Sequence, residues 1–387
     1  MATEGKSAMT TTNEARRQEA GPPVGDAQGR LAAFVMLAGT LISLSGLAWD
    51  IGWHTDVGPD SFFTLPHLFV YSGGAIAGLT SLVMVLRATS AQRHGIEPDP
   101  AVGGRAFKVL GVFAAPIGYL IGGIAAASFL VYGLWDEWWH GLYGFDVTIA
   151  SPPHQGWLNS ICMTIMGTVI VFAAAREHLW GRYGLMTALA CFGSYFTITS
   201  SALGDINLDS QINWVGLAWV VIPIACVLLG ARVIPRGGAV GSGLINLVVN
   251  LVIWNFANWA VVWYADVQHL ALRDFSELGF PVERLVLPAA VFVFSVVVEL
   301  LLRWRDANAW LLGLYGGVGA AVIMWWVTVQ FGGGRGPYGD GSTGVWLTCI
   351  AALVLGALIS AAVWRLGYAL RLANTRRTDT SDAAVAA

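Results

Sequence analysis

Two short patterns of Asp and His residues carry the strongest chemical signal in the sequence. In the first pattern, Asp50 is followed by His54 four residues later and by His67 after a polar loop. Asp50 and His54 lie about one helical turn apart, so they share a helix face. Pro66 precedes His67 at a position that suits the start of the next helix. A helical hairpin would therefore bring one carboxylate and two imidazoles together.

The second pattern repeats these residue types at nearly the same spacing. Asp136 is followed by His140 four residues later, and Pro153 and His154 open the next apolar segment. The same geometric argument applies, because the Asp and the first His share a face and the second His begins the following helix. We interpret the two hairpins as an internal repeat.

Each pattern offers two imidazole nitrogens and one carboxylate oxygen. Such a set with open coordination positions suits Cu(II) or non-haem Fe(II), and less distinctively Zn(II). Hydrogen-bonded structural clusters without metal are the alternative. Haem is disfavoured because a proline-containing loop separates the two histidines of each pair, so a single helix does not carry both. The sequence does not assign a catalytic residue. The predicted metal ligands are Asp50, His54, His67, Asp136, His140 and His154.

The elements that must position these ligands lie in a chain with the composition of a membrane protein. Of its 387 residues, 56% are hydrophobic and only 12% are charged, whereas a soluble domain has about 25% charged residues. The mean hydropathy is +0.63. This composition disfavours a soluble enzyme, a disordered scaffold, a disulfide-stapled domain and a nucleic-acid-binding protein. The four cysteines lie in apolar runs, where we expect packed free thiols.

Ten segments are apolar and about 20 residues or more in length, as a membrane-spanning helix requires. We therefore predict an all-α, polytopic membrane bundle with about ten transmembrane helices and with membrane lipid around it. The third and tenth segments exceed the minimum length and should tilt or project beyond the bilayer. The expected spans are 31–53, 66–87, 106–137, 154–175, 182–203, 213–234, 242–265, 284–303, 308–330 and 344–371.

The distribution of basic residues predicts how the bundle is oriented. If both termini are cytoplasmic, all but three of the 21 Lys and Arg residues lie on the cytoplasmic side, the exceptions being Arg273, Arg284 and Arg335. Both Asp/His/His patterns then lie at the extracytoplasmic face of the cell membrane. The expected organisation is a disordered cytoplasmic tail at 1–30, metal-site hairpins at 31–175, additional transmembrane helices at 176–372 and a second disordered tail at 373–387.

Two asparagines interrupt the apolar sequence of the span expected at 242–265. Asn246 and Asn250 lie at helical spacing and therefore share a face. Hydrogen bonding to a neighbouring helix is the favoured explanation. A polar path for a substrate or for protons is the alternative.

The first motif resembles that of the C subunit of the copper membrane monooxygenases, the particulate methane and ammonia monooxygenases. That subunit carries the pattern Asp-x3-His-x12-His, which Asp50, His54 and His67 match. The family also has an Asp and a Phe-Thr pair in the loop before the last His. Asp60 and the Phe63-Thr64 pair stand in the corresponding places here.

The second motif resembles a further set in the same subunit, Asn-x3-His-x13-His. Asp136, His140 and His154 reproduce its spacing, with Asp136 in place of the family's Asn. The added negative charge could alter which metal or oxidation state is favoured. The resemblance covers about residues 45–160. The chain then continues through about six more spans, which is more than the family's C subunit leads us to expect. No segment looks like the family's soluble copper-binding B domain.

The resemblance implies that the six residues bind copper in two nearby sites. It also implies activation of O2 to oxidise a small apolar substrate, with other membrane subunits or a second copy of the chain as partners. The sequence does not decide whether the chain is itself an enzyme. Two other functions stay open: a copper-handling or electron-transfer protein without catalysis, and a metal-free structural subunit of a membrane complex.

Overall fold

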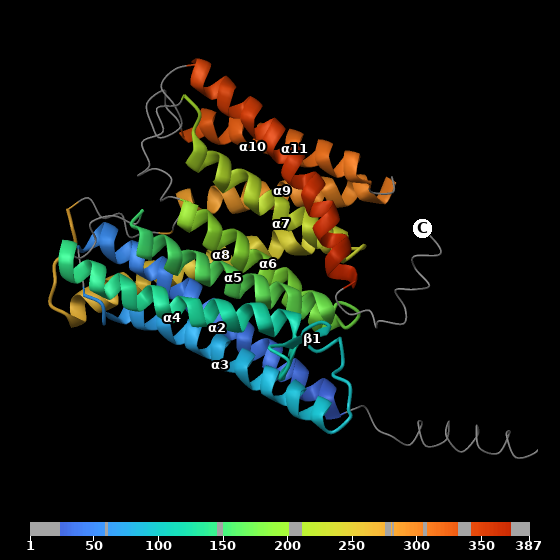
Figure 1. The fold of residues 1–387 in the computed structure, drawn as a ribbon. Helices are drawn as coiled ribbons and strands as arrows, with labels where there is room; N and C mark the ends of the chain where they lie inside the picture. Colours follow the sequence, from blue (N-terminus) through green and yellow to red (C-terminus); the bar gives the residue numbers. More distant parts are fainter. Residues whose placement is uncertain are drawn as a thin grey trace, which may run out of the picture.

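The computed structural model of the protein describes residues 24–58, 61–144, 150–200, 211–274, 280, 282–304, 308–331 and 342–372. Within these residues the chain forms ten helices and one two-stranded hairpin (Figure 1). The elements are α2 (Val24–Asp56), α3 (Leu65–Arg93), β1 (Ala106–Val109), β2 (Phe113–Pro116), α4 (Ile117–Tyr143), α5 (Pro152–Ala174), α6 (Leu179–Thr199), α7 (Trp214–Val233), α8 (Gly238–Val267), α9 (Val282–Trp304), α10 (Ala309–Phe331) and α11 (Ser342–Leu372).

The helical class predicted from the sequence is confirmed. Among the described helices, nine are long and apolar enough to cross a membrane, and α6 is the one outside this set. Helix α6 contains Arg182 together with several Gly, Ser and Thr residues, which lower its hydropathy. It packs against α2, α5, α7 and α8, so protein covers much of its surface and a lipid-compatible surface is not needed there. The four cysteines are free and buried, as expected.

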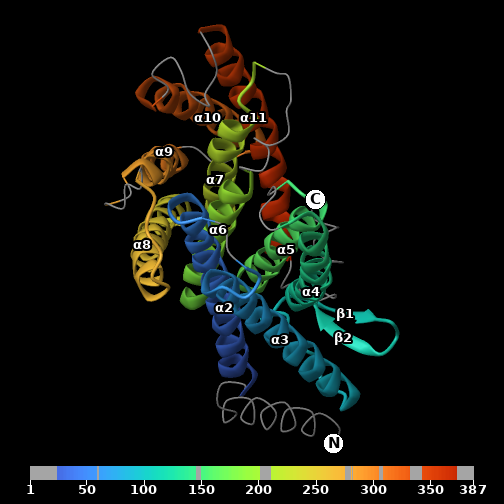
Figure 2. The same cartoon turned by 90° about the vertical axis from the view of Figure 1, so that its left-hand side faces the viewer.

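The first four helices lie at one side of the molecule, and α10 and α11 lie at the opposite side (Figures 1 and 2). Helices α6 to α9 fill the space between these two groups. The start of α2 and the end of α11 lie at the same end of the bundle, close to the β hairpin (Figure 1). At that end, Arg87 near the end of α3 donates a hydrogen bond to Gln28 near the start of α2.

The span expected at 106–137 is wrong over its first part. Residues 106–116 form the antiparallel pair of β1 and β2, and α4 begins only at Ile117. Leu110 and Gly111 adopt positive φ values at the turn between the strands. Pro116 directly precedes the helix, at a position where its fixed φ is tolerated. Hydropathy did not separate the β hairpin from α4, because a short apolar run fits a strand as well as a helix.

The boundary of the predicted N-terminal tail also changes. Helix α2 begins at Val24, so residues 24–30 are helical although they were assigned to the tail. Residues 1–23 and 373–387, which make up the remainder of the two predicted tails, lie outside the described residues.

Glycines bring the helices of each motif hairpin into direct backbone contact. A Cβ atom on Gly73 of α3 would lie 2.4 Å from the carbonyl oxygen of Gly39 on α2. A Cβ atom on Gly167 of α5 would lie 2.7 Å from the backbone nitrogen of Gly122 on α4. Such close approach through small residues is typical of membrane helix pairs. It fixes the depth at which the two helices of each hairpin present their side chains to one another.

Candidate metal centres

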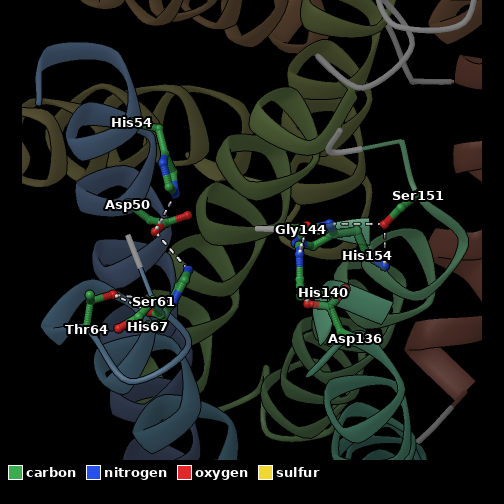
Figure 3. A network of polar contacts seen from close by, with 10 residues as sticks. All are labelled: Asp50, His54, Ser61, Thr64, His67, Asp136, His140, Gly144, Ser151 and His154. Carbon is green, nitrogen blue, oxygen red and sulfur yellow. Dashed lines mark hydrogen bonds and ion pairs between the residues drawn. The ribbon is translucent and has the colours of Figure 1, made fainter. Parts of the chain in front are cut away.

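The structure brings the first predicted set together, and we call this group centre 1. Asp50 and His54 project from the end of α2, and His67 projects from the first turn of α3 (Figure 3). Asp50 Oδ1 lies 3.5 Å from His54 Nε2 and 3.1 Å from His67 Nε2. One potential ligand atom from each residue lies within 4.8 Å of the others. The hairpin geometry predicted from the i, i+4 spacing and the Pro-led helix start is therefore present.

The hydrogen bonds of His67 determine what its ring offers to centre 1. Its Nδ1 atom lies 3.1 Å from the carbonyl oxygen of Ser61 and 3.3 Å from the hydroxyl of Thr64. A carbonyl oxygen only accepts, so Nδ1 carries the proton. In the neutral ring Nε2 then has a lone pair, and it faces the Asp50 carboxylate oxygen. Two acceptors in contact require a proton or a metal cation between them.

The second predicted set is also assembled, and we call it centre 2. Asp136 Oδ2 lies 3.4 Å from His140 Nε2 and 3.5 Å from His154 Nε2. His140 Nδ1 lies 2.9 Å from the carbonyl oxygen of Gly144, so the proton is again on Nδ1 and the Nε2 lone pair faces the carboxylate. The two imidazole rings are 5.1 Å apart, compared with 6.4 Å in centre 1.

A hydroxyl at the start of each second helix contacts its histidine, and the sequence analysis missed both. Ser151 Oγ, at the N-cap of α5, lies 3.1 Å from His154 Nδ1. Thr64 is the N-cap residue of α3 and contacts His67 in the same way. In metal sites such contacts orient a ligating imidazole. The signal was available, because Ser or Thr three residues before the His and ahead of Pro is an N-cap pattern.

Tryptophans surround the two centres differently. Trp49 and Trp53 beside centre 1 are each 2% exposed, and the Trp53 ring lies 4.8 Å from that of Tyr264 on α8. These rings belong to a buried cluster that packs α2 against α8. Beside centre 2, Trp135 and Trp138 are 39% and 59% exposed. They face outward, as residues of an interfacial aromatic belt do.

An aromatic chain links the two centres. The Tyr71 ring stacks on His67 with 6.0 Å between centroids and contacts Trp157 at 6.4 Å. Trp157 in turn lies 6.4 Å from the His154 ring. Tyr71 follows His67 by four residues and Trp157 follows His154 by three. Each aromatic residue therefore shares a helix face with its histidine, a spacing that the sequence analysis did not use.

The residues present fit a metal cation. Each centre supplies two nitrogen donors and one carboxylate, the set favoured by Cu(II) and non-haem Fe(II). Asp136 Oδ1, the oxygen that does not face the imidazoles, is enclosed and has no hydrogen-bond partner among the described residues. A buried carboxylate oxygen without a partner is costly, and a cation would compensate its charge. Asp60, the loop residue that matches the family's Asp before the last His, lies outside the described residues.

Comparison of the chain with protein-family models, with curated proteins and with solved structures found no match in any of the three. The resemblance to the monooxygenase C subunit therefore depends on the two motifs and on the side-chain groupings that they form.

Proposed function

We propose that this chain is an integral membrane protein that binds two copper ions, one in each centre, and that it is related to the C subunit of copper membrane monooxygenases. The observation that carries the proposal is the pairing of imidazole and carboxylate in each centre. His67 and His140 are each held through Nδ1 by a backbone carbonyl, and each turns Nε2 toward an Asp oxygen. This arrangement prepares lone pairs for a cation.

Bound copper would supply the capacity to bind and reduce O2, and the proposed activity is oxidation of a small apolar substrate. The chain's own residues would hold and tune the metal. The imidazoles bind it, the carboxylates offset its charge, and the loop carbonyls keep the imidazoles in the required tautomer. Trp49 and Trp53, the sequence neighbours of Asp50 and His54, are buried, and dry surroundings of this kind would protect a reactive centre.

We also propose that α6 crosses the membrane, so that the chain crosses ten times with both termini cytoplasmic and both centres extracytoplasmic. The excess of Lys and Arg on one side supports this orientation. The common location of the start of α2 and the end of α11 supports an even number of crossings (Figure 1).

The orientation can be tested by cysteine labelling in a variant whose four native cysteines are Ala. In intact cells, a membrane-impermeant maleimide should label Asp266→Cys, which lies at the end of the bundle that carries centre 1. Gln92→Cys, near the end of α3, should be labelled only after the membrane is permeabilised. Both positions are exposed within the chain. The reversed pattern would contradict the proposed orientation.

The metal function can be tested by electron paramagnetic resonance of Cu(II)-loaded protein in lipid nanodiscs. Each copper should show coupling to two imidazole nitrogens, and His54→Ala and His140→Ala should each lose the signal of one centre. With a reductant and a short alkane, the loaded protein should consume O2 in proportion to product. Copper binding without O2 consumption would favour the copper-handling function, and protein that binds no copper would favour the structural one.

A further inference from the structure

A cavity of about 530 Å³ lies among helices α6 to α10, outside both centres. Cavities of this size hold small organic ligands. Ile51, the neighbour of Asp50 on α2, forms part of one wall. Most of the lining is apolar and comes from the helices that the two motifs do not use. The apolar lining includes Ile198, Val220, Leu287, Val291, Met324 and Val327.

One wall of the cavity is polar. Asn246 and Asn250 on α8 are 6% and 8% exposed and line the cavity. Asn250 Nδ2 donates to Ser194 Oγ on α6 at 2.9 Å and to the backbone carbonyl oxygen of Asn246 at 2.8 Å. The predicted hydrogen bond between α8 and a neighbouring helix is thereby confirmed. These bonds use the donor side of Asn250 and leave its carbonyl oxygen available.

The remaining amide atoms of this pair are not used in hydrogen bonds among the described residues. Within the described part of the chain, neither Asn246 Nδ2 nor Asn250 Oδ1 forms a hydrogen bond. Neither atom is completely enclosed by protein, and both residues line the cavity. The wall therefore presents one donor and one acceptor to whatever occupies the space, and burial makes it costly to leave them unpaired.

The charged group at the cavity is already engaged with an aromatic ring. The Arg284 guanidinium lies 4.1 Å from the centroid of the Trp254 ring, in a cation–π contact. Among the described residues that line the cavity there is no Asp or Glu. Arg284 has a further interaction within the chain, and the indole Nε1 of Trp219, another lining residue, is enclosed by protein. On α8, the polar atoms that stay accessible to a ligand are those of the two amides.

We propose that this cavity binds a neutral, mostly apolar molecule with a single hydroxyl group, of the medium-chain alcohol class. The hydroxyl oxygen accepts from Asn246 Nδ2, and the hydroxyl hydrogen is donated to Asn250 Oδ1. The chain of the alcohol packs against Val220, Leu287 and Val291. An alkane would leave both amide atoms unpaired. An ionised carboxylate only accepts hydrogen bonds, so it would leave Asn250 Oδ1 unpaired. The site is independent of the metal centres.

The test uses an octanol that carries a photoreactive diazirine on its chain, added to the full-length protein in nanodiscs. Mass spectrometry should locate the label on cavity residues such as Leu287 and Met324. Octanol should suppress labelling at membrane concentrations about tenfold below those needed for octane, because octane cannot pair the amides. Equal suppression by octane would overturn the hydroxyl assignment, and stronger suppression by octanoate would overturn the neutrality of the ligand.

Variants separate the amide pair from general effects on the bundle. Asn246→Leu should reduce cavity labelling by about tenfold, whereas Asn255→Leu on the same helix should leave it unchanged. Asn255 donates to the Leu251 carbonyl and does not line the cavity. Val291→Trp, which fills the space from α9, should abolish cavity labelling. Unchanged labelling in both Asn246→Leu and Val291→Trp would refute the site. Labelling should be the same with and without copper, so its outcome is separate from that of the metal proposal.

Discussion

Centre 1 and centre 2 use the same residue types at equivalent helix positions, yet they differ in access. The His54 side chain of centre 1 is 27% exposed, whereas that of His140 in centre 2 is 5% exposed. The Asp136 side chain is also less exposed than that of Asp50, at 10% against 15%. The histidines on the second helices differ in the opposite sense, with His154 20% and His67 15% exposed. The same ligand geometry therefore occurs in two environments, and the first helix of the hairpin exposes its ligands more in centre 1 than in centre 2. We expect centre 1 to exchange its metal with the surroundings and centre 2 to retain it.

The loops contribute differently to the two centres. In centre 1 a loop carbonyl, that of Ser61, fixes the histidine on the second helix of the hairpin. In centre 2 the carbonyl of Gly144 fixes the histidine on the first helix, and Ser151 contacts the one on the second. The tautomer is thus set mainly by loop backbone, and a loop can change in sequence while it keeps this function.

The largest effects should come from separating the helices of one hairpin. In Gly73→Leu the new side chain meets the α2 backbone, so α2 and α3 must move apart. Centre 1 should lose its copper and centre 2 should keep its own. In Gly167→Leu, centre 2 should lose its copper and centre 1 should keep its own. Copper EPR of each variant measures this, and the centre that is retained is the control for folding. Loss of the same centre in both variants would contradict independent assembly.

The next largest difference should follow removal of the negative charge. Asp136→Asn should weaken copper binding at centre 2 by about 100-fold, because charge interactions are stronger in the more enclosed centre. Asp50→Asn should weaken centre 1 by about tenfold. Competition with a copper chelator of known affinity measures both values. Equal losses would show that the difference in exposure has no electrostatic consequence.

Exchange of bound copper should distinguish the centres directly. On addition of a water-soluble chelator, copper should leave in two phases whose rates differ by about tenfold, since the surrounding shell controls access to a metal site. His67→Ala should remove the fast phase and His154→Ala the slow one. A single phase in the wild-type protein, or the reverse assignment, would contradict the access argument.

The smallest effects should come from the hydroxyls that contact the histidines. Ser151→Ala should weaken copper binding at centre 2 by about tenfold, within the usual range for groups that orient a ligating imidazole. Thr64→Val should change centre 1 by less than about threefold, because His67 Nδ1 keeps the Ser61 carbonyl. Isothermal titration measures both affinities, with thermal stability measured alongside since Ser151 also caps α5. A larger effect in Thr64→Val would reverse this ranking.

The sequence predicts the ligand groups because their geometry is local. The Asp and the first His are one helical turn apart, and Pro66 and Pro153 start the helices that carry the second His. The contact between Trp53 and Tyr264 depends on how α8 packs against α2. The positions of the Ser61 and Gly144 carbonyls, which accept from His67 and His140, depend on the backbone conformation of the loops. Neither leaves a periodic signal. The β hairpin at 106–116 was missed because hydropathy measures polarity and is insensitive to backbone conformation.

The central claim is that each centre holds one copper ion, and elemental analysis tests it most directly. The protein would be purified without a tag and without chelators, then reconstituted with copper and freed of excess. The account predicts two copper ions per chain, one in His67→Ala, one in His154→Ala and none in the double variant. Iron or zinc in these proportions would contradict the choice of copper. A wild-type protein that holds no metal after reconstitution would contradict the account as a whole.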